Sequence, residues 1–156
     1  MTDKNTKKRF KLLQKHVRFI HALVITLSLA WISLATAKDF DALLKEAVQG
    51  ESYAQYDLGV IYSQGLGVPQ DYNEAVRWYR KAAEQGDSDA QYNLGVMNIQ
   101  GNGVPEDYIT AHMWLNLAAA QGHVSAAEYR SKLTALMTSQ QIAEAQAAAR
   151  KWASTH

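Results

Sequence analysis

Small and apolar residues recur at three- and four-residue steps along most of the chain after residue 37, which is the spacing of one face of a helix. Two such stripes follow one another: Ala54, Leu58 and Tyr62 form the first, and Ala75, Trp78 and Ala82 form the second. Between the stripes, Gly65 and Gly67 permit a sharp exit from a helix, and Pro69 cannot continue one. The pattern therefore predicts a unit made of helix, turn and helix.

The predicted unit occurs twice in the sequence. Residues 51–86 and 87–122 align without gaps and are identical at 20 of 36 positions, so chance is not a serious explanation. The same phase extends outwards, because Ala47 and Gly50 lie 36 residues before Ala83 and Gly86. We therefore expect a repeat domain over residues 38–156, with a partial repeat at 38–50 and a degenerate repeat with a cap at 123–156.

Helix-start signals agree with these boundaries. Asp71 is expected to cap the second helix of the first unit, and Glu74 three residues later predicts a capping box. Asp107 is the equivalent cap in the second unit. Near the C-terminus, Thr138 and Gln141 have the spacing of another capping box. These signals place helix starts where the apolar stripes begin.

Gly59 lies in the middle of a predicted helix, and Gly95 takes the same place in the second copy. Glycine in a helix interior costs about 1 kcal/mol relative to alanine. Its recurrence predicts that the two helices of a unit approach each other closely at this point. Trp78 and Trp114 are expected to fill the volume that remains between neighbouring units.

Two more helices are expected after the second unit, over residues 124–137 and 142–152. The second has an apolar stripe that can seal the last repeat, formed by Ile142, Ala145, Ala149 and Trp152. The prediction is therefore an all-α chain of helix-turn-helix repeats with a C-terminal capping helix pair.

The first 37 residues have a different composition. A basic stretch between Lys4 and Arg18 precedes a run of about 16 mostly apolar residues, and the small residues Ala35 and Ala37 follow. This is the layout of a secretory signal peptide, residues 1–37, with cleavage expected after Ala37. We therefore expect the protein to be exported, in a bacterium to the periplasm. The alternative is an uncleaved N-terminal membrane anchor, although the apolar run is short for a span.

Charge and composition exclude several functions. Without its first 37 residues the chain has nine basic and 14 acidic residues, which gives no electrostatic basis for nucleic-acid binding. The sequence has no cysteine. Among the usual motifs of serine nucleophiles and zinc sites, none is present, and His112, His123 and His156 are too scattered to indicate a metal site. We therefore expect no catalytic residues, no metal and no cofactor.

The motif Ala-x-x-x-Leu-Gly-x-x-Tyr-x-x-Gly-x-Gly-Val, residues 54–68, resembles the Sel1-like repeat, a relative of the tetratricopeptide repeat. Asp71, Ala75, Trp78 and Gly86 complete the motif, while Asn98 replaces the motif tyrosine in the second copy. The resemblance implies a short right-handed α-solenoid whose first helices line a concave face. It also implies an adaptor that binds a protein or peptide. For an exported chain, we expect this partner to be an envelope protein.

The candidate partner-binding residues lie on the first helix of each unit. They are Tyr53, Tyr56, Asp57, Val60 and Ser63 in the first copy, and Asp89, Tyr92, Asn93, Val96 and Ile99 in the second. Tyrosine is a common anchor at protein interfaces. Alternatively, Tyr56 and Tyr92 pack between neighbouring helices. The absence of Lys and Arg makes this surface unsuited to gripping a C-terminal carboxylate, and an amphipathic helix or extended apolar peptide fits it better.

Two functions of other classes remain open. Some cysteine-rich exported members of the family are linked to β-lactam binding or hydrolysis, so a cell-wall or β-lactam hydrolase is one alternative, although this chain lacks their cysteines. An enzyme should have a deep pocket with perturbed acids or bases. The other alternative is an envelope protein that self-associates into a homo-oligomer through the exposed end of its short repeat array.

Overall fold

The computed structural model describes residues 39–156. The contacts between residues divide the chain into two units, of which the first ends at Asp41 and the second comprises residues 42–156. In the first unit the described residues, 39–41, are helical. The predicted signal peptide, residues 1–37, lies outside the described residues. The repeats lie in the second unit.

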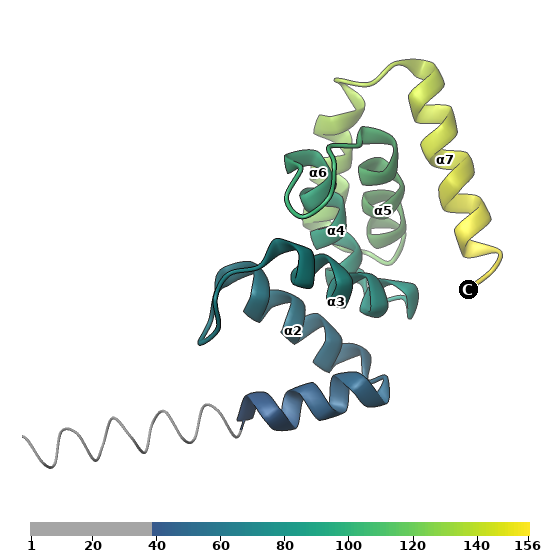
Figure 1. Cartoon of the computed structure of the whole chain (residues 1–156). Helices are drawn as coiled ribbons and strands as arrows, with labels where there is room; N and C mark the ends of the chain where they lie inside the picture. Colours follow the sequence, from purple (N-terminus) through teal and green to yellow (C-terminus); the bar gives the residue numbers. More distant parts are fainter. Residues whose placement is uncertain (1–38) are drawn as a thin grey trace, which may run out of the picture. The chain divides into compact units, whose positions relative to one another are not determined.

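Every regular element of residues 42–156 is a helix, and successive helices follow one another as repeats (Figure 1). After the helical residues 42–49, the bounds are α2 Ser52–Gln64, α3 Tyr72–Glu84, α4 Ser88–Gln100, α5 Tyr108–Ala120, α6 Val124–Thr134 and α7 Ser139–Ala153. Helices α2 and α3 form the first predicted unit, and α4 and α5 form the second. The all-α helical-repeat solenoid predicted from the sequence is confirmed.

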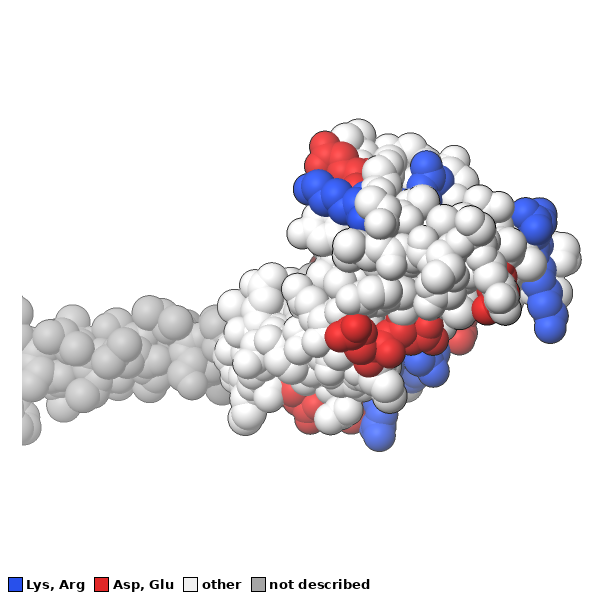
Figure 2. Space-filling model, turned by 90° about the horizontal axis from the view of Figure 1, so that it is seen from above, with Lys and Arg blue, Asp and Glu red and all other residues white. Residues whose placement is uncertain are grey.

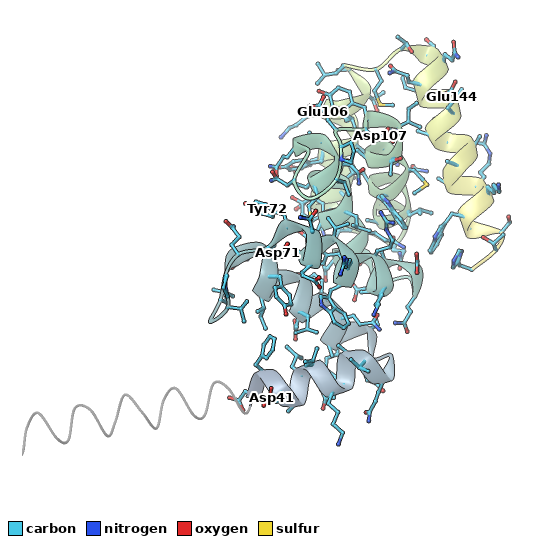
Figure 3. The ribbon with its side chains drawn as sticks, viewed as in Figure 1. Asp41, Asp71, Tyr72, Glu106, Asp107 and Glu144 are labelled. Atoms are coloured by element: carbon cyan, nitrogen blue, oxygen red, sulfur yellow. The ribbon has the colours of Figure 1, made fainter. Side chains whose placement is uncertain are left out.

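The starts of these helices follow the predicted signals with one exception. Asp71 and Asp107, which lie at the starts of α3 and α5 (Figure 3), each accept two backbone N–H groups of the first turn. The capping box of Thr138 is also present. The capping box predicted for Glu74 is wrong. The backbone N–H of Asp71 donates to the carbonyl of Tyr62 at 2.9 Å instead, and Glu74 pairs with Arg77 at 2.7 Å.

The close approach predicted at the helical glycines is confirmed. A Cβ at Gly59 would overlap the ring of Tyr79 on α3, and a Cβ at Gly95 would lie 2.6 Å from the side chain of Leu115 on α5. Because Tyr79 and Leu115 occupy equivalent positions, both units use the same contact. The absence of a side chain on the first helix allows a large side chain of the second helix to fill the space.

Buried glutamines connect each unit to the one before it. The amide of Gln91, which is fully buried, donates to the Ala83 carbonyl at the end of α3 and accepts a hydrogen bond from Gln121 at 2.9 Å. Gln55 makes the same contacts one repeat earlier, with the carbonyl of Ala47 and with Gln85. Each glutamine therefore gives a second hydrogen bond to a helix-end carbonyl that also accepts a backbone N–H of the following turn.

Helix α6 packs on α5 as α4 packs on α3, but α7 does not continue the repeat geometry. Helices α6 and α7 both pack mainly on α5 rather than on each other, and α7 runs beside α5 (Figure 1). Ala145 and Ala149 are buried in this contact, and the ring of Trp152 lies edge-on to Trp114 at 6.0 Å. The stripe that was predicted to seal the last repeat thus covers the second helix of that repeat.

The predicted helix over residues 124–137 ends earlier, at Thr134. Two backbone hydrogen bonds, from Leu136 to Leu133 and from Met137 to Thr134, turn the chain there. Met137 is buried in the cluster that joins α5, α6 and α7. Among the helices of residues 39–156, none is long and apolar enough to cross a membrane.

Candidate functional site

The candidate site is the solvent-accessible side of the first helices of the units, which the family resemblance predicts to line a concave face. We call it the A-helix face, and it comprises Tyr53, Tyr56, Asp57 and Val60 of α2, Asp89, Tyr92, Asn93 and Val96 of α4, and Tyr129 of α6. Tyr53, Asp57, Asp89 and Tyr129 are exposed, and the other members are half-buried. The A-helix face is therefore accessible and still firmly seated on the core beneath it.

Side chains of the A-helix face link consecutive helices in a regular way. The hydroxyl of Tyr56 on α2 interacts with the side chain of Asn93 on α4. One repeat later, Tyr92 on α4 interacts with Tyr129 on α6, and their rings meet edge-on at 5.5 Å. Because Asn93 and Tyr129 lie 36 residues apart, these are equivalent contacts. The structure thus brings together most of the residues predicted from separate copies.

The two tyrosines at the centre of the face combine packing with exposure. Tyr56 packs on Tyr79, with 5.9 Å between ring centroids, and Tyr92 belongs to the partly buried side chains around the cluster of α5 and α6. Burial, followed by the charge of Asp89, raises the pKa of the Tyr56 hydroxyl. Tyr56 and Tyr92 therefore pack between helices, as one interpretation predicted, and also remain partly exposed, as a partner-binding residue must.

Two of the predicted partner-binding residues lie elsewhere. Ser63 donates to the Val60 carbonyl at 3.0 Å and lies 3.2 Å from the hydroxyl of Tyr79 on α3. Ile99, the equivalent residue, packs against the cluster that contains Leu115. Both side chains thus contact the second helix of their own unit.

Negative charge gathers on the A-helix face. Helices α2 and α4 with their N-caps contain Glu51, Asp57, Asp87 and Asp89 and no Lys or Arg. Burial, followed by the neighbouring charge of Asp87, raises the pKa of the Asp57 carboxyl. On the face seen in Figure 2, too, charged side chains occur in a few groups on a mostly uncharged surface. Among the described helices, α2 and α4 therefore carry negative charge alone.

His123 closes one end of the A-helix face, a role that the sequence did not reveal. Its Nδ1 accepts the backbone N–H of Ala126 and so caps α6, which leaves Nε2 to donate to Asp89 at 3.1 Å. Its ring stacks on Tyr92, with 4.7 Å between centroids. Asp87 was also overlooked, although it occupies the position one repeat before His123.

The hollows described on this unit lie on another side. One of about 650 Å³ is formed between the loops that precede α3 and α5, and one of about 890 Å³ lies along α3 beside Trp78. Neither hollow is lined by Asp57 or His112, an acid and a base whose pKa values are shifted. Asp57 is on the A-helix face and His112 is buried on α5, where burial, followed by the charge of Arg130, lowers its pKa. Within residues 39–156, no group of three or more acidic or histidine side chains could hold a metal ion.

Stacked helix-turn-helix units with a helical cap define the class of α-solenoid repeat proteins. The Sel1 repeat family model matches residues 52–87 and 88–123, each one residue later than the repeats predicted from the sequence. The chain is a member of the Sel1-like repeat family.

Solved structures agree with this assignment. The chain is similar to c5321, a protective antigen present in uropathogenic Escherichia coli strains that displays an SLR fold, with 35% identity over 72% of this chain and a TM-score of 0.70. It is also similar to a Sel1 repeat protein from Oxalobacter formigenes, with 43% identity over 58% of this chain and a TM-score of 0.58. The aligned part spans 24% and 26% of those two chains. No curated protein matches the sequence.

Sel1 repeats commonly mediate protein–protein interaction, and proteins built from them are generally non-enzymatic scaffolds.

Proposed function

We propose that this protein is an exported, non-enzymatic adaptor that binds a protein or peptide of the cell envelope on its A-helix face. The observation that carries the proposal is the continuity of this face, on which Tyr56 of α2 contacts Asn93 of α4 and Tyr92 of α4 contacts Tyr129 of α6. These tyrosines also keep part of their surface exposed. Aromatic side chains held in place by packing lose little entropy on binding, so they are effective anchors.

The rigidity of the supporting unit favours the same function. The rings of Tyr56 and Tyr92 rest on α3, α5 and α6, and the buried glutamines fix each unit against the one before. A partner would therefore meet a preorganised surface rather than one that must first be ordered. Export rests on the basic, apolar and small-residue segments of residues 1–37.

Photocrosslinking in living cells tests the adaptor function. The full chain is expressed with a photoreactive phenylalanine analogue at Tyr53 or Asp89, which are exposed on the A-helix face, or at Arg80 or Glu84, which are exposed on α3. We expect a discrete adduct with one envelope protein from the first pair of positions and none from the second.

Three other outcomes would contradict the proposal. Adducts that form only at Arg80 and Glu84 would place the binding surface on α3 and contradict the proposal. An adduct with the mass of two copies of this chain would favour the self-associating envelope protein instead. If none of the four positions gives an adduct, the adaptor function is rejected.

A further inference from the structure

The surroundings of the central tyrosine differ between the two units, in which Tyr56 and Tyr92 are equivalent. Over Tyr92, the imidazole of His123 stacks on the ring and donates a hydrogen bond to Asp89. This is the combination of aromatic stacking and carboxylate pairing by which a planar, hydrogen-bond-donating group such as a guanidinium is bound in proteins. Above Tyr92, the donor is thus a side chain of the protein itself, His123.

The first unit lacks this donor, and Tyr53 occupies the position where the second unit has the acceptor Asp89. Asp87 occupies the position that corresponds to His123, so an acid replaces the imidazole. The carboxylates of Asp89, Asp87 and Asp57 all act on the hydroxyl of Tyr56 and raise its pKa, after burial. Among the described residues, no basic side chain forms an ion pair with Asp57 or Asp87.

A tyrosine of the same face already carries a cation. The Nζ atom of Lys132 lies 5.5 Å from the ring centroid of Tyr129, which is the geometry of a cation–π contact. Helices α2 and α4 contain no lysine or arginine, whereas the single helix α3 contains Arg77, Arg80 and Lys81. Positive charge from a partner is therefore what the α2–α4 part of the A-helix face lacks.

We propose that the part of the A-helix face around Tyr56, Asp57 and Asp89 binds an arginine- or lysine-bearing peptide segment of the partner, with a cationic side chain placed over Tyr56 among the carboxylates. This inference rests on the proposed adaptor function and adds the chemical class of the partner. An acidic segment or a nucleic acid would be repelled by these carboxylates, and a purely apolar segment would cover their charges without compensating them.

Binding of synthetic peptides tests the inference. The probes are fluorescent peptides of about 12 residues with arginine at every third position, and a matched peptide with citrulline, the neutral isostere of arginine, at the same positions. Fluorescence anisotropy is measured with the protein purified after expression of the full chain. We expect the arginine peptide to bind with a Kd on the order of 10–100 μM, and the citrulline peptide to bind at least about tenfold more weakly.

Matched variants locate the site. Asp57→Asn/Asp89→Asn is expected to weaken binding of the arginine peptide by about threefold to tenfold, because each exposed ion pair contributes a factor of up to about five. Glu84→Gln/Glu144→Gln changes the net charge equally on α3 and α7 (Glu144 is labelled in Figure 3) and is expected to leave binding unchanged. Melting curves of both variants verify the fold.

Three results would overturn the inference: equal affinity for the citrulline peptide, equal loss of binding in the two variants, or no binding of the arginine peptide up to about 1 mM. Photocrosslinking separates this failure from that of the adaptor function. If Tyr53 and Asp89 still give an adduct while the arginine peptide does not bind, the adaptor function stands and only the cationic class of partner is wrong.

Discussion

At the scale of residues, differences between the two copies occur in matched pairs. Ser63 contacts the hydroxyl of Tyr79 in the first unit, whereas the equivalent residues Ile99 and Leu115 are both apolar and belong to the same buried cluster. A polar pair in one copy is thus replaced by an apolar pair in the other. The physical reason is that a buried hydroxyl needs a partner, so neither residue of such a pair can change alone at low cost.

His112 breaks this pattern and has a consequence for stability. It replaces Val76 of the first unit, it is 3% exposed, and its Nδ1 has no hydrogen-bond partner. Burial, followed by the charge of Arg130, lowers its pKa, so the folded protein holds this ring neutral. The unfolded chain binds a proton with the ordinary histidine pKa of about 6.5. The contribution of His112 to the free energy of unfolding is therefore constant above about pH 6.5. It declines as the pH falls towards the lowered pKa of the folded state, because the unfolded chain then binds the proton more readily.

We expect His112→Val to remove this acid-side decline and to raise the free energy of unfolding at neutral pH by about 1 kcal/mol, because an unpaired buried nitrogen disappears. Urea unfolding at several values between about pH 5 and about pH 8 measures both effects. His156→Ala, which removes an exposed histidine at the C-terminus, is the control and should keep the slope of the parent protein. The same slope in His112→Val would show that other groups cause the decline.

At the scale of elements, the composition of α3 and α5 explains where the C-terminal helix packs. Arg77, Lys81 and Glu84 of α3 correspond to Met113, Leu117 and Ala120 of α5. The charged side of α3 remains in water, and Leu117 of α5 belongs to a buried cluster that also contains Ala149 of α7. The replacement of charges by apolar residues in the second copy is therefore the reason why α7 covers α5 and leaves α3 free.

Removal of the Trp152 ring tests the importance of this seal. Trp152 is half-buried against Trp114, so Trp152→Ala is expected to lower the free energy of unfolding by about 1–3 kcal/mol, less than for a fully buried tryptophan. Hydrogen exchange should become faster in α7 and at the end of α5, with α2 and α3 less affected. Lys151→Ala, next to it on the exposed side of α7, is the matched control. Unchanged exchange in α7 would mean that the small buried alanines are sufficient to hold this helix.

At the scale of the whole molecule, the proposed export of the protein depends on residues 1–37. If signal peptidase cleaves after Ala37, the protein recovered after expression of the full chain begins at Lys38. Ala35→Leu/Ala37→Leu should abolish cleavage, since the enzyme requires small residues at these positions. Thr36→Leu, between them, should be tolerated. Intact-mass measurement distinguishes the forms, and a parent protein that keeps all 156 residues would favour the anchored alternative.

Charge also organises the molecule as a whole. The net negative charge of residues 38–156 is not spread evenly. The charged residues of α2 and α4 are all acidic, whereas most basic residues lie on α3, α6 and α7. Long-range attraction of a cationic partner would therefore be directed to one side, with association rates that fall as salt increases.

The sequence by itself determined the repeat, the helix-turn-helix unit and the close contact at Gly59 and Gly95. Each of these is local or follows from the fixed period of 36 residues, so helical periodicity and glycine chemistry suffice to predict it. The stripe of α7 was predicted for the same reason. The family assignment, carried by a motif with fixed spacing, was equally accessible from the residues.

Only the tertiary structure decided how residues of different units meet. The contacts of Tyr56 with Asn93, of Tyr92 with Tyr129 and of His123 with Asp89 cross between helices, and the register of that crossing depends on how the units stack. The buried glutamines and the unpartnered Nδ1 atom of His112 could not be predicted for the same reason. A single chain shows which side chains share a helix face, but the packing angle between helices determines which of them touch.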